Sequence, residues 1–301
     1  MKDIVYIPTN GKKLNRNQFN HYFERKIFRL IRKFQLIDIK DKIAVATSGG
    51  KDSNVTLYVL NKFCKKRNQK LEAMAVNEGL GKYRDNLLKE LKKFCKKENI
   101  NLNIFYFKKE YGFTLESKLK KIKKLGLSNC YVCSILKRWL LNKKAREMGF
   151  TLIASGLSLD DEAETIILNQ LKGNPSLLAK LGPIVGMSRQ KGFVQRIKPL
   201  YSCLEKEIIL YAKLNNIPLP LEVCPVRGET FRVEIRNFLR ELEKKHPEAK
   251  SAIVNSFLEL MPLLKQHYKK DAQPKKCRKC KEIASKEICK RCQILEMLKA
   301  K

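Results

Sequence analysis

Between residues 42 and about 200, short apolar runs alternate with longer stretches in which apolar residues recur every three or four positions. The short runs are typical of buried strands, and the periodic stretches are typical of helices with one buried face. We expect strands at 43–47, 71–76, 102–107 and 151–155, and helices near 53–66, 83–98, 132–148 and 159–172. Alternating strands and helices form βαβ units, so this pattern predicts an α/β fold with a mostly parallel sheet flanked by helices.

The segments on either side of this region are predicted to be helical. Residues 1–40 carry an apolar stripe at three- and four-residue spacing, with basic residues on the opposite face: Phe19, Phe23, Ile27, Leu30 and Phe34. The basic face either contacts RNA or is simply solvated. After a Gly- and Pro-rich loop at 173–192, further helices are expected near 203–215, 229–244 and 248–265. We therefore expect three domains: a basic helical region (1–40), a catalytic domain (41–265) and a cysteine module (266–301).

A glycine-rich motif lies between the first predicted strand and the helix that follows it: Ser48, Gly49, Gly50, Lys51, Asp52 and Ser53. Such a turn points backbone N–H groups at an anion, and the helix dipole adds partial positive charge. The motif does not fit the P-loop pattern of kinases and GTPases. It resembles instead the pyrophosphate-binding loop of the N-type ATP pyrophosphatases, which cleave ATP to AMP and pyrophosphate. The alternative is an ordinary βα turn.

Two other predicted strands end in segments that should face the same crevice, because ligands of parallel sheets bind at the carboxyl ends of the strands. These segments are 77–81 and 156–161, and Glu78 and Arg84 near the first of them are possible neighbours of a nucleotide. Asp160, Asp161 and Glu162 could simply be a charged first turn of a helix, which the dipole favours. The place of Asp161 opposite the phosphate loop favours a role in the site.

The charge of the chain is strongly positive. Lys and Arg total 64 against 30 Asp and Glu, so the net charge is +34, and the excess is spread along the whole length. This imbalance favours a polyanionic partner, with nucleic acid first and a membrane surface as the weaker alternative. There is no apolar run of about 18 residues and no apolar stretch typical of a signal peptide. We expect a soluble cytoplasmic protein with no membrane partner.

Ten cysteines in such a protein favour metal or redox chemistry over disulfides. Cys64, Cys95 and Cys203 lie apart on partly apolar segments and are expected to be core thiols. Near the C-terminus a C-x₂-C-x₈-C-x₂-C pattern predicts a structural Zn²⁺ site flanked by Lys and Arg, and its ligands are Cys277, Cys280, Cys289 and Cys292. A redox dithiol is the alternative.

Three further cysteines form a second group. Cys130 and Cys133 make a C-x-x-C pair, and Cys224 lies far downstream. Three thiolates can hold a [4Fe–4S] cluster with one open iron, whereas the pair alone also suits a redox pair or half of a zinc site. Lys137 follows Cys133 by one helical turn.

Together these motifs resemble the tRNA 2-thiolation enzymes of the TtuA and NcsA type and, more distantly, the TtcA cytidine thiolases. The resemblance covers about residues 40–292 and rests on the glycine-rich motif, the pair Cys130 and Cys133 with Lys137, Gly156 with the acidic run after it, Glu222-x-Cys224-Pro225, and the terminal cysteines. The family differs from this chain at Leu157 and Ser158, where it often has His and Asn. The TtuA type also opens with a second zinc finger, whereas the first 60 residues here contain no Cys.

The resemblance implies an enzyme that thiolates carbon 2 of a tRNA uridine, with ATP, Mg²⁺ and a [4Fe–4S] cluster on Cys130, Cys133 and Cys224. The residues that match its nucleotide site are Ala46, Ser48, Gly49, Gly50, Lys51, Asp52, Ser53, Val76, Lys137, Gly156 and Asp161. Asp52 or Asp161 would bind Mg²⁺, and Lys137 would neutralise the α-phosphate. A homodimer is implied, with a thiocarboxylated ubiquitin-like protein or sulfide as the sulfur donor.

Three alternatives to this function stay open on the residues alone. One is 2-thiolation of a tRNA cytidine. The second keeps the ATP chemistry but uses Cys130 and Cys224 as a persulfide relay without a cluster. The third is a non-catalytic, zinc-containing RNA-binding protein that uses only the basic surface.

Overall fold

The structure is a computed structural model that describes residues 4–8, 11–187, 194–220, 222–228, 230–269, 275–284 and 286–299. The last residues of the predicted loop at 173–192 lie outside these ranges, and so do residues 270–274 at the start of the predicted cysteine module.

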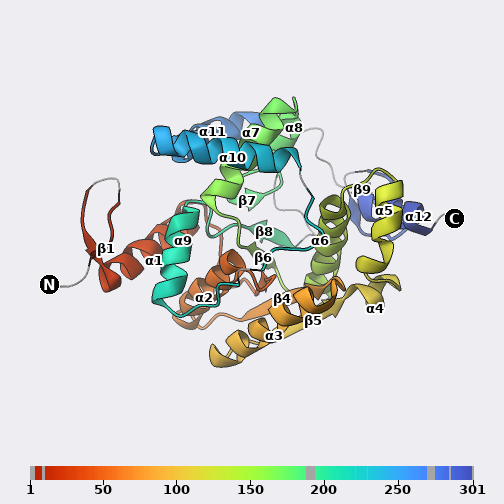
Figure 1. The fold of residues 1–301 in the computed structure, drawn as a ribbon, viewed down its shortest axis with the longest axis horizontal. Coiled ribbons are helices and arrows are strands. Elements are labelled where there is room, and N and C mark those ends of the chain that lie inside the picture. The colour runs from red at the N-terminus through yellow and green to blue at the C-terminus, as the bar shows by residue number, and fades with distance from the viewer. Residues whose placement is uncertain are drawn as a thin grey trace.

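The centre of the molecule is a sheet of six strands in the described chain, in the order β5-β4-β3-β6-β8-β7 (Figure 1). The strands are β3 (Ile43–Ala46), β4 (Leu71–Asn77), β5 (Leu102–Tyr106), β6 (Leu152–Ser155), β7 (Ile184–Val185) and β8 (Gln195–Ile197). Neighbouring strands run parallel except for β7, which is antiparallel to β8. The predicted α/β class and all four predicted strands are therefore confirmed. The strands β7 and β8 were not predicted.

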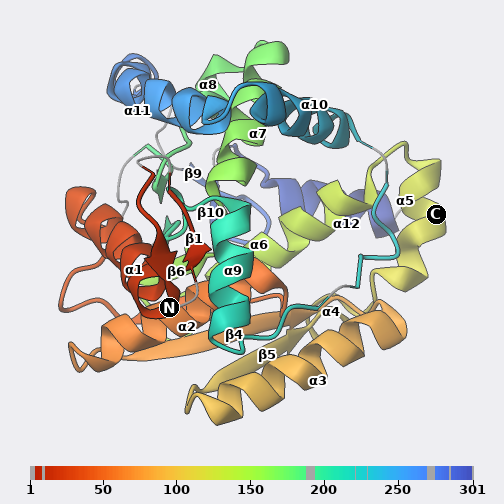
Figure 2. The same cartoon turned by 60° about the vertical axis from the view of Figure 1, so that its left-hand side comes forward.

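Helices surround the sheet, and the long ones begin and end within three residues of the predicted positions. They are α1 (Arg16–Lys33), α2 (Lys51–Lys65), α3 (Gly81–Lys97), α6 (Asn129–Glu147), α7 (Leu159–Leu171), α9 (Glu205–Leu214), α10 (Phe231–Lys245) and α11 (Ala249–His267). Shorter helices are α4 (Phe107–Tyr111), η1 (Glu116–Lys118), α5 (Leu119–Lys124) and α8 (Pro175–Leu178). Both α10 and α11 pack on α7 and form a helical layer above the sheet in Figures 1 and 2.

Two small antiparallel ladders lie outside the sheet. Near the N-terminus β1 (Ile4–Tyr6) pairs with β2 (Leu14–Asn15), and near the C-terminus β9 (Lys275–Lys276) pairs with β10 (Ile283–Ala284). The chain ends in α12 (Lys290–Lys299), which packs against α6.

The predicted N-terminal helix is α1, and its apolar stripe belongs to the main core. Phe19, Phe23 and Ile27 are fully buried. The Phe23 ring stacks on Tyr211 of α9, with 4.4 Å between the ring centroids. The helix begins at a capping box, in which Asn15 and Gln18 each bond the other's backbone N–H. Region 1–40 therefore packs against the sheet-bearing part of the chain, and the proposed domain boundaries stay a prediction.

The order of the strands creates a crevice beside β3. From β3 the chain moves outward to β4 and β5, and it then returns to the other side of β3 for β6 and β8. Ligands of such sheets bind where the direction of winding reverses, outside the carboxyl ends of the strands. Ala46 lies opposite Met74 of β4 and Ser155 of β6, so the segments after these three strands meet at one edge.

Candidate active site

The glycine-rich motif forms the turn from β3 into α2, as predicted. The loop is held from inside by the Ser53 hydroxyl, which donates to the Gly50 carbonyl oxygen at 2.8 Å and accepts from the Thr47 hydroxyl at 3.1 Å. The Asn54 amide donates to the Gly49 carbonyl oxygen at 2.9 Å. Gly49 has a φ of +83°, a conformation that glycine adopts without strain. The loop is thus preformed at the N-terminus of α2, where anions bind.

Gly156 lies directly against this loop from the end of β6. A Cβ atom added at Gly156 would stand 2.6 Å from the backbone carbon and oxygen of Asp52 and 2.7 Å from the nitrogen of Ser53. These are backbone atoms, which cannot move aside easily. The β6–α7 turn can therefore approach the first turn of α2 only because residue 156 has no side chain.

Lys51, the first residue of α2, is held by two carboxylates. Its Nζ lies 2.9 Å from Asp52 Oδ2 and 2.8 Å from Glu205 Oε1 of α9. Burial lowers the pKa of Lys51, but Asp52 and Glu205 together outweigh burial, so the net pKa is raised. The ammonium is therefore charged and stands beside the anion-binding turn.

One carboxylate oxygen of Asp52 accepts no hydrogen bond from the described residues. This oxygen, Oδ1, is buried. Burial raises the pKa of Asp52, and the nearby carboxylate of Asp161 adds to this rise. A pair of neighbouring carboxylates, one of which has an oxygen without a hydrogen bond, is suited to a divalent cation.

Asp161 caps the start of α7, which is the alternative that the sequence left open. It also lies close to Asp52. Its Oδ2 accepts from the backbone N–H and the hydroxyl of Ser158, both at 3.1 Å, and completes a capping box at the start of α7. Its Oδ1 lies 3.9 Å from Nη2 of Arg232.

An unbroken series of contacts joins the glycine-rich loop to Cys133. Arg84 Nη1 donates to the Ser48 carbonyl oxygen at 2.5 Å, and Arg84 Nε lies 3.1 Å from Glu78 Oε2. Glu78 Oε1 in turn lies 3.3 Å from Lys137 Nζ. Arg84 and Glu78 are both buried, so this ion pair is shielded from water. The sequence had singled out Glu78 and Arg84 only as possible neighbours of a nucleotide.

Arg84 also bonds the backbone of Val76. The Arg84 Nε and Nη2 donate to the Val76 carbonyl oxygen, at 2.9 and 2.5 Å. Because Nε directs its hydrogen there, Glu78 Oε2 keeps no hydrogen bond although the charges are adjacent. Val76 is buried, whereas Ala46 at the end of β3 is half-buried. Both line the carboxyl edge of the sheet, as predicted.

Cys130 and Cys133 lie one turn apart at the start of α6, where the helix dipole favours thiolates. Cys130 is exposed, Cys133 is buried and Cys224 is half-buried. Cys133 and Cys224 belong to one apolar cluster, together with Val226. Burial raises the pKa of Cys133 to about 11, although Lys137 acts in the opposite direction, so Lys137 lies close to this thiol.

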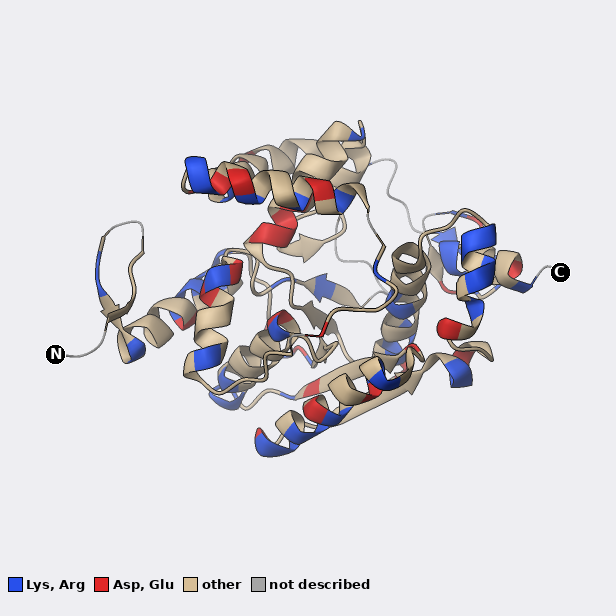
Figure 3. Cartoon of the chain, viewed as in Figure 1, with Lys and Arg blue, Asp and Glu red and all other residues tan. Residues whose placement is uncertain are grey.

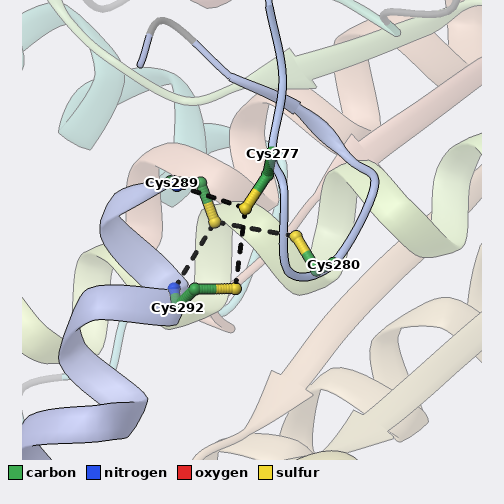
Figure 4. Close-up of side chains that lie close together, drawn as sticks. All are labelled: Cys277, Cys280, Cys289 and Cys292. Carbon is green, nitrogen blue, oxygen red and sulfur yellow. Dashed lines mark hydrogen bonds between the residues drawn. The ribbon is translucent and has the colours of Figure 1, made fainter. Parts of the chain in front are cut away.

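The four terminal cysteines converge on a single point (Figure 4). Their sulfur atoms all lie within 4.8 Å of one another, with 3.9 Å from Cys277 to Cys292 and 3.7 Å from Cys280 to Cys289. Backbone N–H groups of Cys289 and Cys292 donate to the sulfurs of Cys277 and Cys289. Burial raises the pKa of Cys277, but backbone N–H groups outweigh it and lower the pKa to about 6.

This module is docked on α6, the helix that carries Cys130, Cys133 and Lys137. Arg146 of α6 forms a two-fold ion pair with Glu282, with both N–O distances at 2.5 Å. Arg291 lies over the Trp139 ring, 4.0 Å from its centroid. Ile294 and Leu298 of α12 are buried in the same apolar cluster as Cys133.

The fold and the loop together are those of a nucleotide-binding α/β protein, and comparisons with known proteins identify its family. A family model described as a PP-loop domain matches residues 19–242. The chain is 34% identical over 275 residues to a tRNA-5-methyluridine(54) 2-sulfurtransferase of Pyrococcus horikoshii, covering 91% of this chain and 85% of that one. It is 26% identical over 311 residues to the tRNA 2-thiolation protein NcsA of Haloferax volcanii, and the match covers 99% of this chain and 97% of that one.

A solved structure agrees with these relatives. The U34-tRNA thiolase NcsA from Methanococcus maripaludis, with its [4Fe–4S] cluster, superposes with a TM-score of 0.82 at 30% identity, and covers 96% of this chain and 92% of that chain. The chain belongs to the PP-loop family, and within it to the tRNA 2-thiolation proteins of the TtuA and NcsA type. The predicted family is confirmed. None of the helices in the described ranges has the length and apolarity needed to cross a membrane.

Proposed function

We propose that this protein is an ATP-dependent tRNA uridine 2-sulfurtransferase. It adenylates the C2 oxygen of a tRNA uridine, releases pyrophosphate, and replaces that oxygen with sulfur as AMP leaves. The named activities of its relatives support this function. The observation that carries it is the series of contacts from Ser48 through Arg84 and Glu78 to Lys137, because it brings an anion-binding loop and Cys133, a proposed cluster ligand, to one edge of the sheet.

The nucleotide would lie along the carboxyl edge of β3 and β4. Backbone N–H groups of residues 48–53 would hold the departing pyrophosphate and stabilise its charge. Ala46 and Val76 would border the nucleoside, and Gly156 would keep the wall of the site close to α2. Lys137 would neutralise the α-phosphate as the uridine oxygen attacks it.

Mg²⁺ would be held by Asp52 and Asp161. The fit rests on the unpartnered, buried Asp52 Oδ1 and on the electrostatic contact between these two carboxylates. Mg²⁺ needs only one or two protein carboxylates, since phosphate oxygens and water complete its shell.

Cys130, Cys133 and Cys224 would bind the [4Fe–4S] cluster. Cys133 and Cys224 share an apolar cluster next to Lys137, and a buried thiol with a high pKa gives up its proton when it binds a metal. These three do not form a tight group like the terminal cysteines. That is expected, since a cluster puts its own iron and sulfide atoms between the thiolates. When bound, the cluster supplies an open iron at which sulfur can be held.

Zn²⁺ would be held by Cys277, Cys280, Cys289 and Cys292. Four sulfurs at ~2.3 Å from one tetrahedral ion stand roughly 3.8 Å apart. The distances of 3.9 and 3.7 Å match this arrangement.

The remaining features of the proposal concern partners and organisation. The substrate is tRNA, and the sulfur comes from sulfide or from a thiocarboxylated ubiquitin-like protein. Relatives named as cytoplasmic tRNA 2-thiolation proteins support a cytoplasmic location. We further propose a homodimer and the three-domain division at residues 40 and 265.

The experiment is anaerobic thiolation of unmodified tRNA by the purified protein with Mg·ATP and sulfide, followed by mass spectrometry of the nucleosides. We expect ATP-dependent 2-thiouridine, and fragment mapping then locates it in the anticodon or the T-loop. Cys133→Ser should lower the rate by more than about 100-fold, because it removes a cluster ligand. Cys95→Ser changes a buried thiol of α3 and is the matched control.

Other outcomes contradict the proposal in distinct ways. A thiolated cytidine would assign the other base, and full activity of an iron-free protein would favour the persulfide relay. Binding of tRNA without any ATP-dependent pyrophosphate release or thiolation would favour the non-catalytic RNA-binding protein.

A further inference from the structure

Two arginines lie together on the flank of α6 that faces away from Glu78. Arg196 of β8 is in register with Ile153 of β6, and its Nη2 donates to the backbone oxygen of Arg138 at 3.2 Å. Lys137 and Arg138 are consecutive on a helix, so their side chains point about 100° apart. Lys137 reaches Glu78 near β4, whereas Arg138 turns toward β8 and α10.

These two cations lack a counter-charge. No carboxylate in the described ranges pairs with Arg138 or Arg196. Burial and then Arg138 lower the pKa of Arg196 to about 10, and burial and then Arg232 lower the pKa of Arg138. Each of these guanidinium groups thus lies near a second positive charge, Arg196 near Arg138 and Arg138 near Arg232, which costs stability unless an anion is bound there.

The neighbouring cations have acidic partners, so among the described residues the lack of a carboxylate partner is specific to Arg138 and Arg196. Lys198, two residues further along the chain, forms a buried ion pair with Glu162 at 2.7 Å. Arg232 lies 3.0 Å from Glu164, and Arg236 lies 2.6 Å from the same carboxylate. Within the described residues, Glu162 and Glu164 thus pair with these three neighbouring cations, and no carboxylate pairs with the two arginines.

The position of the pair suits a ligand that enters from solvent. Arg138 is exposed, so a ligand can reach it from solvent. Figure 3 shows Lys and Arg on β8 and on α6 at the centre of the molecule. The pair is also near the site, since Arg138 directly follows Lys137.

We propose that Arg138 and Arg196 bind a backbone phosphate of the substrate RNA next to the target uridine, an inference that rests on the proposed function. Two guanidinium forks match the oxygens of a phosphodiester. The phosphates of ATP have their own loop after β3, and β8 lies two strands away, which is roughly 10 Å. The nucleoside of ATP is assigned to the β4 side of β3, so the β8 side is left for the RNA.

The test is a comparison of tRNA and ATP binding by Arg138→Gln and by the wild-type protein. We expect tRNA affinity to fall about tenfold, since one charge-assisted contact is lost. The slope of log affinity against log salt should fall by about 1. ATP affinity should not change. Arg138→Lys, which keeps the charge but not the fork, should lie between the two.

Arg67→Gln is the matched control, because Arg67 is exposed beyond the end of α2, at the amino edge of the sheet. Unchanged tRNA affinity and salt slope in Arg138→Gln would overturn the inference, and weaker ATP binding alone would assign the pair to the nucleotide. Failure of the wild-type protein to bind tRNA would instead overturn the proposed function, and this inference with it. Arg196→Gln, checked for folding by thermal melting, should reproduce the result of Arg138→Gln.

Discussion

At the scale of single residues, Gly156 shows that the site depends on a position without a Cβ atom. The turn after β6 and the first turn of α2 come from segments about a hundred residues apart in sequence. They meet at a distance that excludes even a methyl group, because that group would lie 2.6 Å from the Asp52 backbone. The spacing between Asp52 and Asp161, the proposed Mg²⁺ ligands, depends on this contact.

Gly156→Ala should therefore damage both folding and nucleotide binding. We expect a loss of ~1–3 kcal/mol in the free energy of unfolding, as for other overpacked sites. Mg·ATP affinity should fall at least about tenfold, since the two carboxylates are pushed apart. Denaturant unfolding and calorimetric titration measure the two effects.

Gly228→Ala is the control for this experiment, because a Cβ atom at Gly228 meets nothing within 4 Å and its φ is not in the left-handed region. It should leave both quantities close to those of the wild-type protein. Equal behaviour of the two variants would contradict the account of Gly156.

How well single residues could be predicted depended on whether their chemistry is local in sequence. The glycine-rich loop and the four terminal cysteines are contiguous patterns, and their geometry is as expected. Glu205 and Arg196 were not predicted, because they reach the site through long-range contacts that no spacing in the sequence encodes. Arg84 was predicted only as a possible neighbour of a nucleotide, and its contact with the Ser48 carbonyl oxygen could not be. Asp161 was ambiguous because one carboxylate both caps a helix and faces Asp52.

At the scale of elements, α6 is the helix on which most of the site depends. Its first turns carry Cys130, Cys133 and Lys137, and its outer side carries Trp139 and Arg146, which hold the cysteine module. The module in turn buries Ile294 and Leu298 beside Cys133. The small cysteine module therefore braces the helix that bears Cys130 and Cys133.

Loss of one of the proposed zinc ligands should thus loosen α6. A module this small would fold only with a bound metal, so Cys289→Ser should unfold it and free α12. We expect amide exchange in residues 129–147 to rise more than about tenfold, which is the loss of ~1.4 kcal/mol of local stability. Hydrogen exchange with mass spectrometry measures this, and iron content should fall in parallel.

Arg278→Gln provides the comparison, since Arg278 is an exposed residue of the same module that pairs only with Glu287 among the described residues. Its exchange pattern should match that of the wild-type protein. Unchanged protection of α6 after loss of the module would show that the helix does not need this support.

The elements themselves were predictable where they were long. Helices such as α2, α3 and α7 carry several turns of apolar periodicity, so their ends could be placed within a few residues. The strands β7 and β8, of two and three residues, are too short to show a pattern. They exist because β6 offers an edge to pair with, which is a tertiary effect.

At the scale of the whole molecule, the net charge of +34 is the dominant property. Figure 3 shows Lys and Arg on almost every helix, so the excess surrounds the fold and is not confined to one tail. A polyanion is attracted from any direction by such a field, whereas the position of the target base must be selected by the crevice.

We therefore expect tRNA affinity to depend steeply on salt. Each phosphate contact contributes a slope of ~0.7–0.9 in log affinity against log salt, so a slope of about 4 or more should be found. Fluorescence titrations between about 50 and 200 mM salt measure it. ATP binding serves as the internal comparison, because fewer charges are involved. A tRNA affinity that is insensitive to salt would contradict a dominant role for the basic surface.

The ion pair between Lys51 and Glu205 has a consequence for turnover. An incoming triphosphate would have to compete with a carboxylate that already neutralises this lysine, and Glu205 would then keep cations of α10 near it, Arg240 at 3.7 Å and also Arg236. The free energy gained on binding would be the difference between the attraction of Lys51 for the phosphates and its attraction for Glu205. Pyrophosphate would consequently be bound less tightly than by an unopposed lysine, and the return of Glu205 would help to expel it so that the next cycle can begin.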